Sequence, residues 1–501
     1  MPRPGRERFA GDAPSAAVVG GGIAGLAAAT ALAERGVRVT LYEQGEALGG
    51  RLAGWPVRLA DGSEATMSRG FHAFFRQYYN LRGLLRRADP GLASLTPLPD
   101  YPLLHRDGTA DSFAQVPRTP PWSALGFVAL SPTFGWRDLA AMNPRAALPL
   151  LDVRVPEVYE RFDGVSAEAF LHRINFPEAA HHLAFEVFSR SFFADPRELS
   201  AAELLLMFHI YFLGSSEGLL FDVPNEPFPQ ALWDPLGGYL RRLGTEVRTR
   251  TPVLRVRPAA DGDLMVETEG AADRHQAVVL ALDTRGLRHL VASSEQLGQS
   301  GGASWRADIA ALRTAPPFLV SRLWLDRPLR EDRAGFLGTS GFDGLDNVSV
   351  LDRWEGESAR WAARTGGSVV ELHAYAVAEG TEPKEVQRRM LDRLHEIYPE
   401  TADAGVVDAR HEWRADCPVF SVGGHRRRPG VRTPHPRVTL AGDLVRTGLP
   451  VALMERAATS GFLAANALLA DWGVRGQVLW TVPRAGRSPF LRALAGRAVR
   501  R

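Results

Sequence analysis

The feature that most constrains this chain is a glycine-rich turn near its start. Residues 16–19 read Ala-Ala-Val-Val, a short apolar run of strand length, and Gly20-x-Gly22-x-x-Gly25 follows directly. In such a turn the first glycine allows the tight bend, the second lets backbone approach a pyrophosphate, and the third lets the next helix pack on the strand. The phosphate would lie at the helix N-terminus, where backbone amides favour an anion. The sequence therefore predicts a dinucleotide-binding site.

The segments after the turn supply the context that this motif requires. Residues 26–35 are rich in Ala and Leu and predict a helix that ends before Gly36, and residues 37–42 predict a second strand. Glu43 follows that strand, at a place where an acid can accept hydrogen bonds from a ribose. The alternative is a strand–helix–strand turn with a structural role only, and the acid favours the nucleotide.

A Gly-Gly-Arg sequence just beyond this acid distinguishes between dinucleotides. Gly49, Gly50 and Arg51 lie within Glu-Ala-Leu-Gly-Gly-Arg-Leu-Ala-Gly-Trp, which resembles the flavin amine-oxidase and carotene-desaturase superfamily. The resemblance implies that the two glycines pass close under the cofactor and that the arginine faces its phosphates. It therefore favours FAD over NAD.

A second flavin segment lies near the other end of the chain. Residues 438–443 read as a strand that ends in Ala-Gly442-Asp443, and Met454 opens a helix with small residues on one face. In the superfamily that this segment resembles, the aspartate binds the ribityl and pyrophosphate region. A helix N-terminus there can stabilise negative charge on the cofactor. FAD is the predicted cofactor.

The order of these segments predicts a discontinuous α/β fold. A middle flavin segment would place the backbone of Val253 near adenine. The FAD-binding domain, Rossmann-type and GR2-like as in flavin amine oxidases, would comprise residues 14–85, 228–290 and 418–480. The two insertions would form an α+β substrate domain, residues 86–227 and 291–417. Within the first insertion, Ser200-x-x-Glu203 predicts a capping box that opens an apolar helix over residues 204–213.

One string of residues points to a particular branch of the superfamily. Residues 68–80, Ser-Arg-Gly-Phe-His-Ala-Phe-Phe-Arg-Gln-Tyr-Tyr-Asn, resemble a segment of plant- and cyanobacterial-type phytoene and zeta-carotene desaturases. Together with Cys-Pro-Val-Phe from Cys417 and Leu-Met-Glu-Arg-Ala-Ala-Thr-Ser-Gly from Leu453, the string is most similar to the actinobacterial beta-carotene desaturase/methyltransferases of the isorenieratene synthase type. Arg76 departs from the plain desaturases, which have glycine there.

The resemblance implies a specific chemistry and a set of site residues. Each beta-ionone ring of beta-carotene would lose two hydride/proton pairs while one geminal methyl group migrates, which gives an aromatic phi-type ring. His72 is the candidate proton acceptor, because imidazole has an ordinary pKa near 6.5; a structural histidine packed beside phenylalanines is the alternative. Phe74, Phe75 and Arg76 are candidate substrate-binding residues, and Arg76 could instead hold an ion pair.

The composition excludes several classes of partner. The 59 Lys and Arg residues nearly balance the 57 Asp and Glu residues, for a net charge of +2, so no nucleic-acid partner is expected. Cys417 is the single cysteine, which excludes an intrachain disulfide or a cysteine-held iron–sulfur cluster. The adjacent His181 and His182 would point apart on a helix, and no metal site is expected. FAD would therefore pass electrons directly to an external acceptor, with a quinone as one candidate.

The end of the chain predicts a distinct basic segment. Residues 484–501 contain six arginines and no acid, and apolar residues recur there at helical spacing. This pattern is typical of an amphipathic helix on an anionic membrane surface; a helix docked on the protein or a solvated tail is the alternative. No run reaches the ~18 apolar residues of a spanning helix, so we expect a cytoplasmic protein, and peripheral contact with the cytoplasmic membrane depends on which of these two interpretations of the tail holds.

Several related functions remain as alternatives at this stage. Amine oxidases of the usual design keep a lysine near the flavin, and the one lysine of this chain, Lys384, is expected at the exposed start of a helix. Phytoene or zeta-carotene desaturases and squalene-processing flavoenzymes would need the same tunnel and cofactor. A prenyl-binding escort protein of the same fold is the non-enzymatic alternative, and the intact flavin motifs disfavour it.

Overall fold

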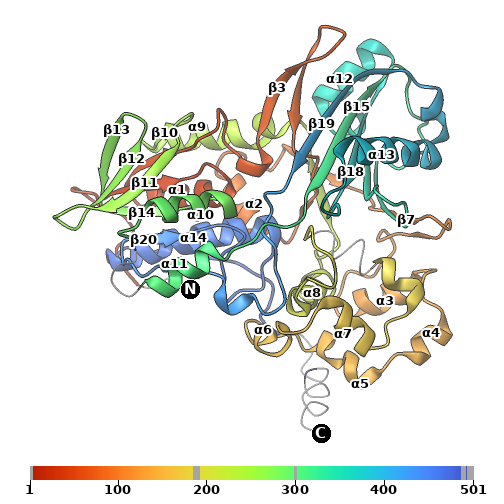
Figure 1. Ribbon diagram of the computed structural model, residues 1–501, viewed down its shortest axis with the longest axis horizontal. Helices are drawn as coiled ribbons and strands as arrows, with labels where there is room; N and C mark the ends of the chain where they lie inside the picture. Colours follow the sequence, from red (N-terminus) through yellow and green to blue (C-terminus); the bar gives the residue numbers. More distant parts are fainter. Residues whose placement is uncertain (1–3, 184–191, 298–301, 487–491, 493–501) are drawn as a thin grey trace.

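A parallel β-sheet assembled from three distant parts of the chain forms the core of one half of the molecule, at the left of Figure 1. The computed structural model describes residues 4–183, 192–297, 302–486 and 492. The sheet has the order β10-β2-β1-β14-β20, and its neighbouring strands run parallel. Its strands are β1 (Ser15–Val19), β2 (Arg38–Tyr42), β10 (Glu246–Arg248), β14 (Ala277–Leu280) and β20 (Val438–Leu440). The predicted discontinuous Rossmann-type arrangement is confirmed.

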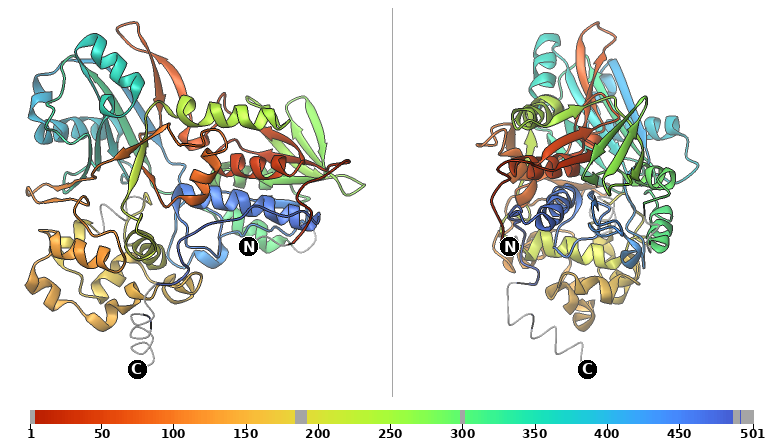
Figure 2. Two further views of the ribbon diagram at one scale, coloured as in Figure 1. Left: turned by 180° about the vertical axis from the view of Figure 1, so that it is seen from behind. Right: turned by 90° about the vertical axis from the view of Figure 1, so that its left-hand side faces the viewer.

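Two helices rich in small residues cover one face of this sheet. α1 (Ile23–Glu34) follows the glycine-rich turn, and α14 (Leu453–Asp471) packs along it, as the two orientations of Figure 2 show. Gly461 permits their close approach, since a Cβ there would lie 2.1 Å from the carbonyl oxygen of Ala24. α14 in turn holds α2 (Tyr79–Leu85): the Glu455 carboxylate accepts hydrogen bonds from the backbone amides of Asn80 and Leu81, each at 2.9 Å.

The remaining elements of this half surround the sheet. A three-stranded antiparallel meander lies between β10 and β14 in the sequence, and it comprises β11 (Val253–Pro258), β12 (Leu264–Thr268) and β13 (Ala271–His275). The accompanying helices are α9 (Asp234–Arg242), α10 (Thr284–Ser293) and α11 (Ala303–Ala310).

A second, mixed sheet of seven strands is built from both insertions. Its order is β19-β15-β18-β17-β16-β7-β8, and α13 packs on β15 and β18. The strands are β7 (Leu103–His105), β8 (Ala110–Asp111), β15 (Phe318–Leu325), β16 (Phe336–Ser340), β17 (Asn347–Val350), β18 (Ser368–Ala374) and β19 (Val406–Arg414), and the helices are α12 (Gly356–Thr365) and α13 (Pro383–Ile397). Lys384 is exposed in the first turn of α13, as the sequence predicts.

A group of short helices from the first insertion lies beside this sheet, at the lower right of Figure 1. They are α3 (Trp122–Leu130), α4 (Trp136–Ala141), α5 (Pro144–Ala147), α6 (Glu157–Phe162), α7 (Ala167–Arg173) and α8 (Ala201–Phe208), which continues as a π-helical turn, His209–Leu213. Small strand pairs connect the two halves: β3 (Gly54–Arg58) with β4 (Glu64–Ser68), and β5 (Phe74–Phe75) and β6 (Leu95–Leu98) with β9 (Phe221–Pro224). None of the described helices is long and apolar enough to cross a membrane.

The start of α8 differs from the predicted capping box. The Ser200 hydroxyl caps the helix by accepting from the amide of Ala202 at 3.2 Å, but the backbone amide of Ser200 donates to the carbonyl of Phe420 instead of to Glu203. Glu203 is turned toward two arginines: its carboxylate lies 2.6 Å from Arg428 and 2.7 Å from Arg456. The expectation of a capping box was wrong because two buried guanidinium groups require that carboxylate.

Candidate functional site

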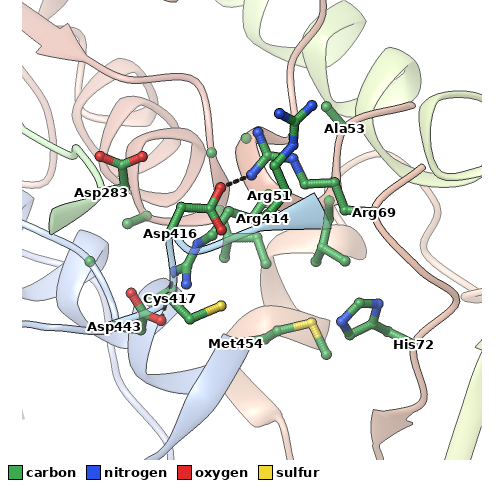
Figure 3. A pocket seen from close by; sticks show the side chains of 18 of the residues that line it. Arg51, Ala53, Arg69, His72, Asp283, Arg414, Asp416, Cys417, Asp443 and Met454 are labelled. Carbon is green, nitrogen blue, oxygen red and sulfur yellow. Dashed lines mark hydrogen bonds and ion pairs between the residues drawn. The ribbon is translucent and has the colours of Figure 1, made fainter. Parts of the chain in front are cut away.

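A cavity of about 1200 Å³ begins at the carboxyl ends of the parallel strands and continues into the second half of the molecule. In sheets of this kind the crevice outside the strand ends is where dinucleotides bind. One end is lined by the glycine-rich turn and by residues after β2 and β14, and the other end is lined mainly by aromatic side chains, namely Phe71, Phe75, Tyr101, Phe113, Phe193, Tyr211, Phe221, Phe318, Phe336 and Tyr375. Figure 3 shows the region between these ends.

The glycine-rich turn has the close approaches that its sequence predicts. Gly20 has a φ of +110°, and a Cβ there would lie 2.3 Å from the carbonyl oxygen of Ala281. A Cβ on Gly25 would lie 1.8 Å from the carbonyl oxygen of Gly20, so α1 can start here only without a side chain. At Gly22, by contrast, the nearest atom to a Cβ is 3.7 Å away. That open space faces the cavity at the N-terminus of α1, where a phosphate would bind.

Glu43 lies beside the turn, at the end of β2. Its carboxylate accepts hydrogen bonds from the backbone amides of Gly21 and Gly45, each at 2.7 Å, and the residue lines the cavity. A carboxylate has about four lone-pair positions, so it keeps capacity for the hydroxyl groups of a ribose. At the same end, Val253 lines the cavity beside Leu282, which is the apolar environment that an adenine ring needs.

Arg51 and Asp443 bring the two flavin motifs together across the cavity. Their side chains form an ion pair of 2.6 Å, with the arginine 31% exposed and the aspartate 15% exposed, and both line the cavity. Burial opposes the charge on Arg51, but the Asp443 carboxylate raises the pKa of the guanidinium above its ordinary value. A permanent positive charge therefore faces the cavity, where it would meet a pyrophosphate.

Gly49 and Gly50 precede Arg51 and have left-handed backbone angles, with φ of +113° and +59°. A Cβ on Gly49 would lie 2.5 Å from the indole of Trp233, so the chain passes tightly between that ring and the turn at Gly22. On the opposite side, Gly442 and Met454 also line the cavity. All eleven predicted cofactor-binding residues except Gly25 therefore border it, and Gly25 acts beneath them in the helix packing.

Three further residues in this region were not predicted as site residues. Figure 3 shows Asp416 and Cys417 beside Arg51, and the Asp416 carboxylate pairs with Arg69. Burial raises the pKa of the Cys417 thiol to about 11, with Asp416 and Asp443 contributing and Arg51 opposing. The thiol is therefore protonated at neutral pH. Arg69 and Cys417 belong to strings that carry the family resemblance, but their meeting with Asp416 beside Arg51 could not be predicted, because it depends on tertiary contacts.

His72 lines the cavity and has a defined tautomer. Its Nδ1 lies 2.6 Å from the carbonyl oxygen of Gly70, and since a carbonyl only accepts, Nδ1 must carry the hydrogen. Nε2 is then left with a free lone pair. Burial, followed by the nearby His373, lowers the pKa of His72 to about 4, so the ring is neutral at physiological pH. This differs from the expected value near 6.5, but the neutral form is the one that accepts a proton.

The three candidate substrate-binding residues separate in the structure. Phe75 lines the cavity and packs against Tyr211 and Phe221. Phe74 points the other way, because side chains alternate along a strand; it is fully buried and packs on Phe228. Arg76 pairs with Asp222 at 3.0 Å and does not border the cavity. Of the three candidates, only Phe75 therefore borders the cavity.

A polar group on β18 was missed by the sequence reasoning. Glu371 and His373 lie on one face of β18, and Tyr375, the first residue after the strand, continues their alternation with Leu372 and Ala374. His373 and Tyr375 line the cavity, and Glu371 lies behind them, paired with the buried Arg322 at 2.7 Å. The signal was the period-2 pattern of Glu-x-His-x-Tyr after an apolar run.

The residues present fit FAD. The open glycine cradle leads to Arg51 and Asp443, Glu43 can accept from a ribose, and the volume exceeds the roughly 300–1,000 Å³ of an ordinary small-ligand pocket. No cluster of His, Cys, Asp and Glu among the described residues could hold a metal ion. Fold and site together define a dinucleotide-dependent redox protein.

Comparison with known proteins makes this assignment specific. The chain belongs to the family described as flavin containing amine oxidoreductase, whose profile matches residues 23–469. It is therefore a flavoprotein oxidoreductase, and the predictions of superfamily and of FAD as cofactor are confirmed.

Three similar proteins illustrate how far the likeness extends. The chain is 73% identical over 499 residues to a carotenoid phi-ring synthase of Streptomyces griseus, covering 99% of this chain and 96% of the relative. A carotenoid phi-ring synthase of Chlorobaculum tepidum is 29% identical over 596 residues, covering 94% of this chain and 91% of the relative. A solved oxidoreductase from Methanosarcina mazei has a TM-score of 0.66 at 17% identity, over 89% of this chain and 98% of that one, which supports the fold.

Proposed function

We propose that this protein is an FAD-dependent carotenoid oxidoreductase that converts the beta-ionone rings of beta-carotene into aromatic phi-type rings. The observation that carries the proposal is the 73% identity, over 99% of the chain, to a protein named carotenoid phi-ring synthase. The cavity supports it, because an aromatic chamber continues directly from the dinucleotide cradle. In this proposal residues 14–85, 228–290 and 418–480 bind FAD, while residues 86–227 and 291–417 enclose the substrate.

The reaction divides the work between cofactor and chain. When bound, FAD supplies a hydride acceptor. Each ring gives up two hydrides and two protons, and one methyl group moves from the geminal carbon to its neighbour. The chain must hold the ring against the cofactor and exclude water, because a carbocation would be trapped by it. The aromatic side chains at the far end of the cavity, such as Phe193, Phe318 and Phe336, provide that dry environment.

His72 is the proposed direct proton acceptor. The Gly70 carbonyl fixes its tautomer with Nδ1–H, so Nε2 is the basic atom. The ring packs against Phe228 and lies within the apolar half of the cavity wall. Because burial keeps its pKa at about 4, His72 is unprotonated and ready to accept at neutral pH.

The substrate is lipid-soluble, and we propose that the enzyme works on the cytoplasmic surface of a membrane. α3 supports this: Trp122 is 61% exposed, Leu125 is 57% exposed and Leu130 is 53% exposed. The inner face of the same helix presents Phe127 to Phe113, which lines the cavity. Exposed arginines flank the helix, namely Arg118 and Arg137, which suits an anionic lipid surface. Most of the predicted basic tail, residues 487–491 and 493–501, lies outside the described residues.

The electron acceptor in this proposal is external, with a quinone as the proposed class. The sequence has a single cysteine, Cys417, so the chain cannot hold a cysteine-ligated iron–sulfur cluster as an internal acceptor. Lys384, the one lysine, is exposed on α13, so the chain has no lysine at the cavity for amine oxidation of the usual design.

Expression in a bacterium that accumulates beta-carotene, followed by pigment chromatography, tests the proposal. The expected product is an aromatic carotenoid. If beta-carotene is unchanged, phytoene, zeta-carotene and squalene are supplied in its place. Consumption of one of them would select the corresponding alternative activity. A purified protein without flavin absorbance would favour an escort role.

A further inference from the structure

A chain of hydrogen bonds runs from the cavity wall along one face of β18 to a buried carboxylate. The Tyr375 hydroxyl lies 2.5 Å from Nδ1 of His373, and Nε2 of His373 lies 2.8 Å from a carboxylate oxygen of Glu371. Glu371 is completely buried and is held by Arg322 and by the backbone amide of Phe71. The series therefore has a phenol at the cavity and an anchored carboxylate at its inner end.

The positions of the hydrogens along this series follow from the partners. Burial alone would raise the pKa of Glu371, but Arg322 and the hydrogen bond from His373 lower it to about 2, so this residue is a carboxylate that only accepts. Nε2 of His373 must then be the donor, and in the tautomer with one ring hydrogen Nδ1 accepts from the hydroxyl of Tyr375. Burial raises the pKa of Tyr375 well above its usual value, which keeps the phenol protonated. A tyrosine that donates to a histidine backed by a carboxylate is poised to pass a proton inward.

We propose that Tyr375, His373 and Glu371 form a proton relay that accepts one of the two protons lost by each carotenoid ring. The ring C–H bond breaks, its electron pair becomes the new C=C bond, and the proton goes to the oxygen of Tyr375. The hydroxyl proton of Tyr375 moves at the same time to Nδ1 of His373, and the Glu371 carboxylate stabilises the resulting imidazolium. The relay resets when the proton returns through Tyr375 to water that is admitted after the product leaves.

The position of the relay relative to His72 supports two separate acceptors. Gly70 lies between them: its carbonyl binds Nδ1 of His72, and a Cβ on it would lie 3.0 Å from the ring of His373. The two histidines therefore approach one stretch of the cavity from different elements. Two protons must leave each ring, and His72 can hold only one until it is discharged. This inference rests on the proposed function, since it assigns protons of that reaction.

Tyr375→Phe is the sharpest test, because it removes one hydroxyl and keeps the ring. We expect aromatic product formation by the purified holoenzyme to fall by about 100-fold or more, with FAD content unchanged and a fall in melting temperature no larger than that of the control variant Tyr398→Phe. The relay moves an exchangeable O–H hydrogen, whereas His72 takes a carbon-bound hydrogen directly. Turnover of the unmodified enzyme should therefore be slower in D₂O than in H₂O, and the variant should lose that difference. Tyr398→Phe is the matched control, since its hydroxyl donates to the carbonyl of Ala334 beneath the same sheet, away from the cavity.

Each result of these measurements either supports or overturns the proton relay. A Tyr375→Phe enzyme that makes aromatic product within a few-fold of the normal rate would overturn the relay. If Tyr375→Phe does not fold, His373→Gln takes its place. The relay then requires that His373→Gln lose product formation and the solvent isotope effect with FAD still bound. Normal turnover of His373→Gln would overturn the relay. An unmodified holoenzyme that makes no aromatic product from beta-carotene would instead refute the proposed function.

Discussion

The ion pair between Arg51 and Asp443 gives the most direct test of the cofactor site. Asp443→Ala would remove the carboxylate that lies 2.6 Å from the guanidinium and is 15% exposed. A hydrogen bond to a charged group contributes about 1.5–3 kcal/mol. If the carboxylate makes one such bond to the ribityl chain of FAD, its loss weakens binding by about 10- to 150-fold, at 1.4 kcal/mol for each factor of ten.

The measurement is the dissociation constant of FAD, obtained by titrating flavin-free protein and following heat or flavin fluorescence. Asp471→Ala is the matched control, because Asp471 also pairs with an arginine, Arg432, and lies at the far end of the helix that starts at the cavity. The control should bind FAD as tightly as the unmodified protein. Equal FAD affinity in Asp443→Ala and in the control would refute the placement of the ribityl chain beside Asp443.

Three other predictions concern catalysis, stability and membrane contact. His72→Ala should lower turnover by about 100-fold or more with FAD retained. Since the pKa of His72 in the folded protein is about 4, turnover of the unmodified enzyme should persist as the pH falls below 6.5 and decline only near pH 4. Stability should decrease as the pH falls from 6.5 to 4, because the unfolded chain binds the proton first. A decline in turnover centred at pH 6.5 contradicts the assignment of His72. Glu203→Gln should reduce the free energy of unfolding in denaturant titrations by about 3–5 kcal/mol, because it leaves Arg428 and Arg456 buried without a counter-charge. Glu385→Gln, in a solvent-screened exposed pair, should leave it essentially unchanged. The double variant Trp122→Ala/Leu125→Ala should bind phosphatidylglycerol vesicles at least about tenfold more weakly in sedimentation assays. Leu254→Ala, which alters an exposed leucine on β11, should bind them normally. Equal binding by both variants refutes membrane contact through α3.

The cofactor half of this site could be predicted from sequence because short motifs of neighbouring residues define it. Gly25 is fixed by the carbonyl oxygen of Gly20 within one strand–turn–helix unit. Gly20 itself meets the distant carbonyl of Ala281, but the Gly-x-Gly-x-x-Gly spacing reveals both glycines. Asp443 follows a strand end that fixes where its side chain lies. Such motifs encode backbone geometry, and the structure places them around one cavity.

The substrate half could not be predicted to the same extent because its charges are paired through tertiary contacts. Arg76 was a candidate substrate residue, but Asp222, which is nearly buried on β9, takes its guanidinium. Glu203 had the spacing of a capping box, but two distant arginines compete for it more strongly than a backbone amide. His373 could have been noticed through strand alternation, yet its proton state depends on Glu371 and Arg322, which only the assembled sheet brings together.

The composite parallel sheet also has a consequence for biosynthesis. β14 pairs on one side with β1, near the start of the chain, and on the other side with β20, whose residues 438–440 come near its end. At about 5–20 residues per second, a ribosome must finish most of the chain before that sheet can close. The nascent protein therefore carries an unpaired edge of β14 for much of its synthesis, which exposes it to wrong strand pairing. A cofactor that binds only the completed crevice would draw the equilibrium toward the correctly closed sheet, so flavin supply in the cell should limit the yield of folded protein.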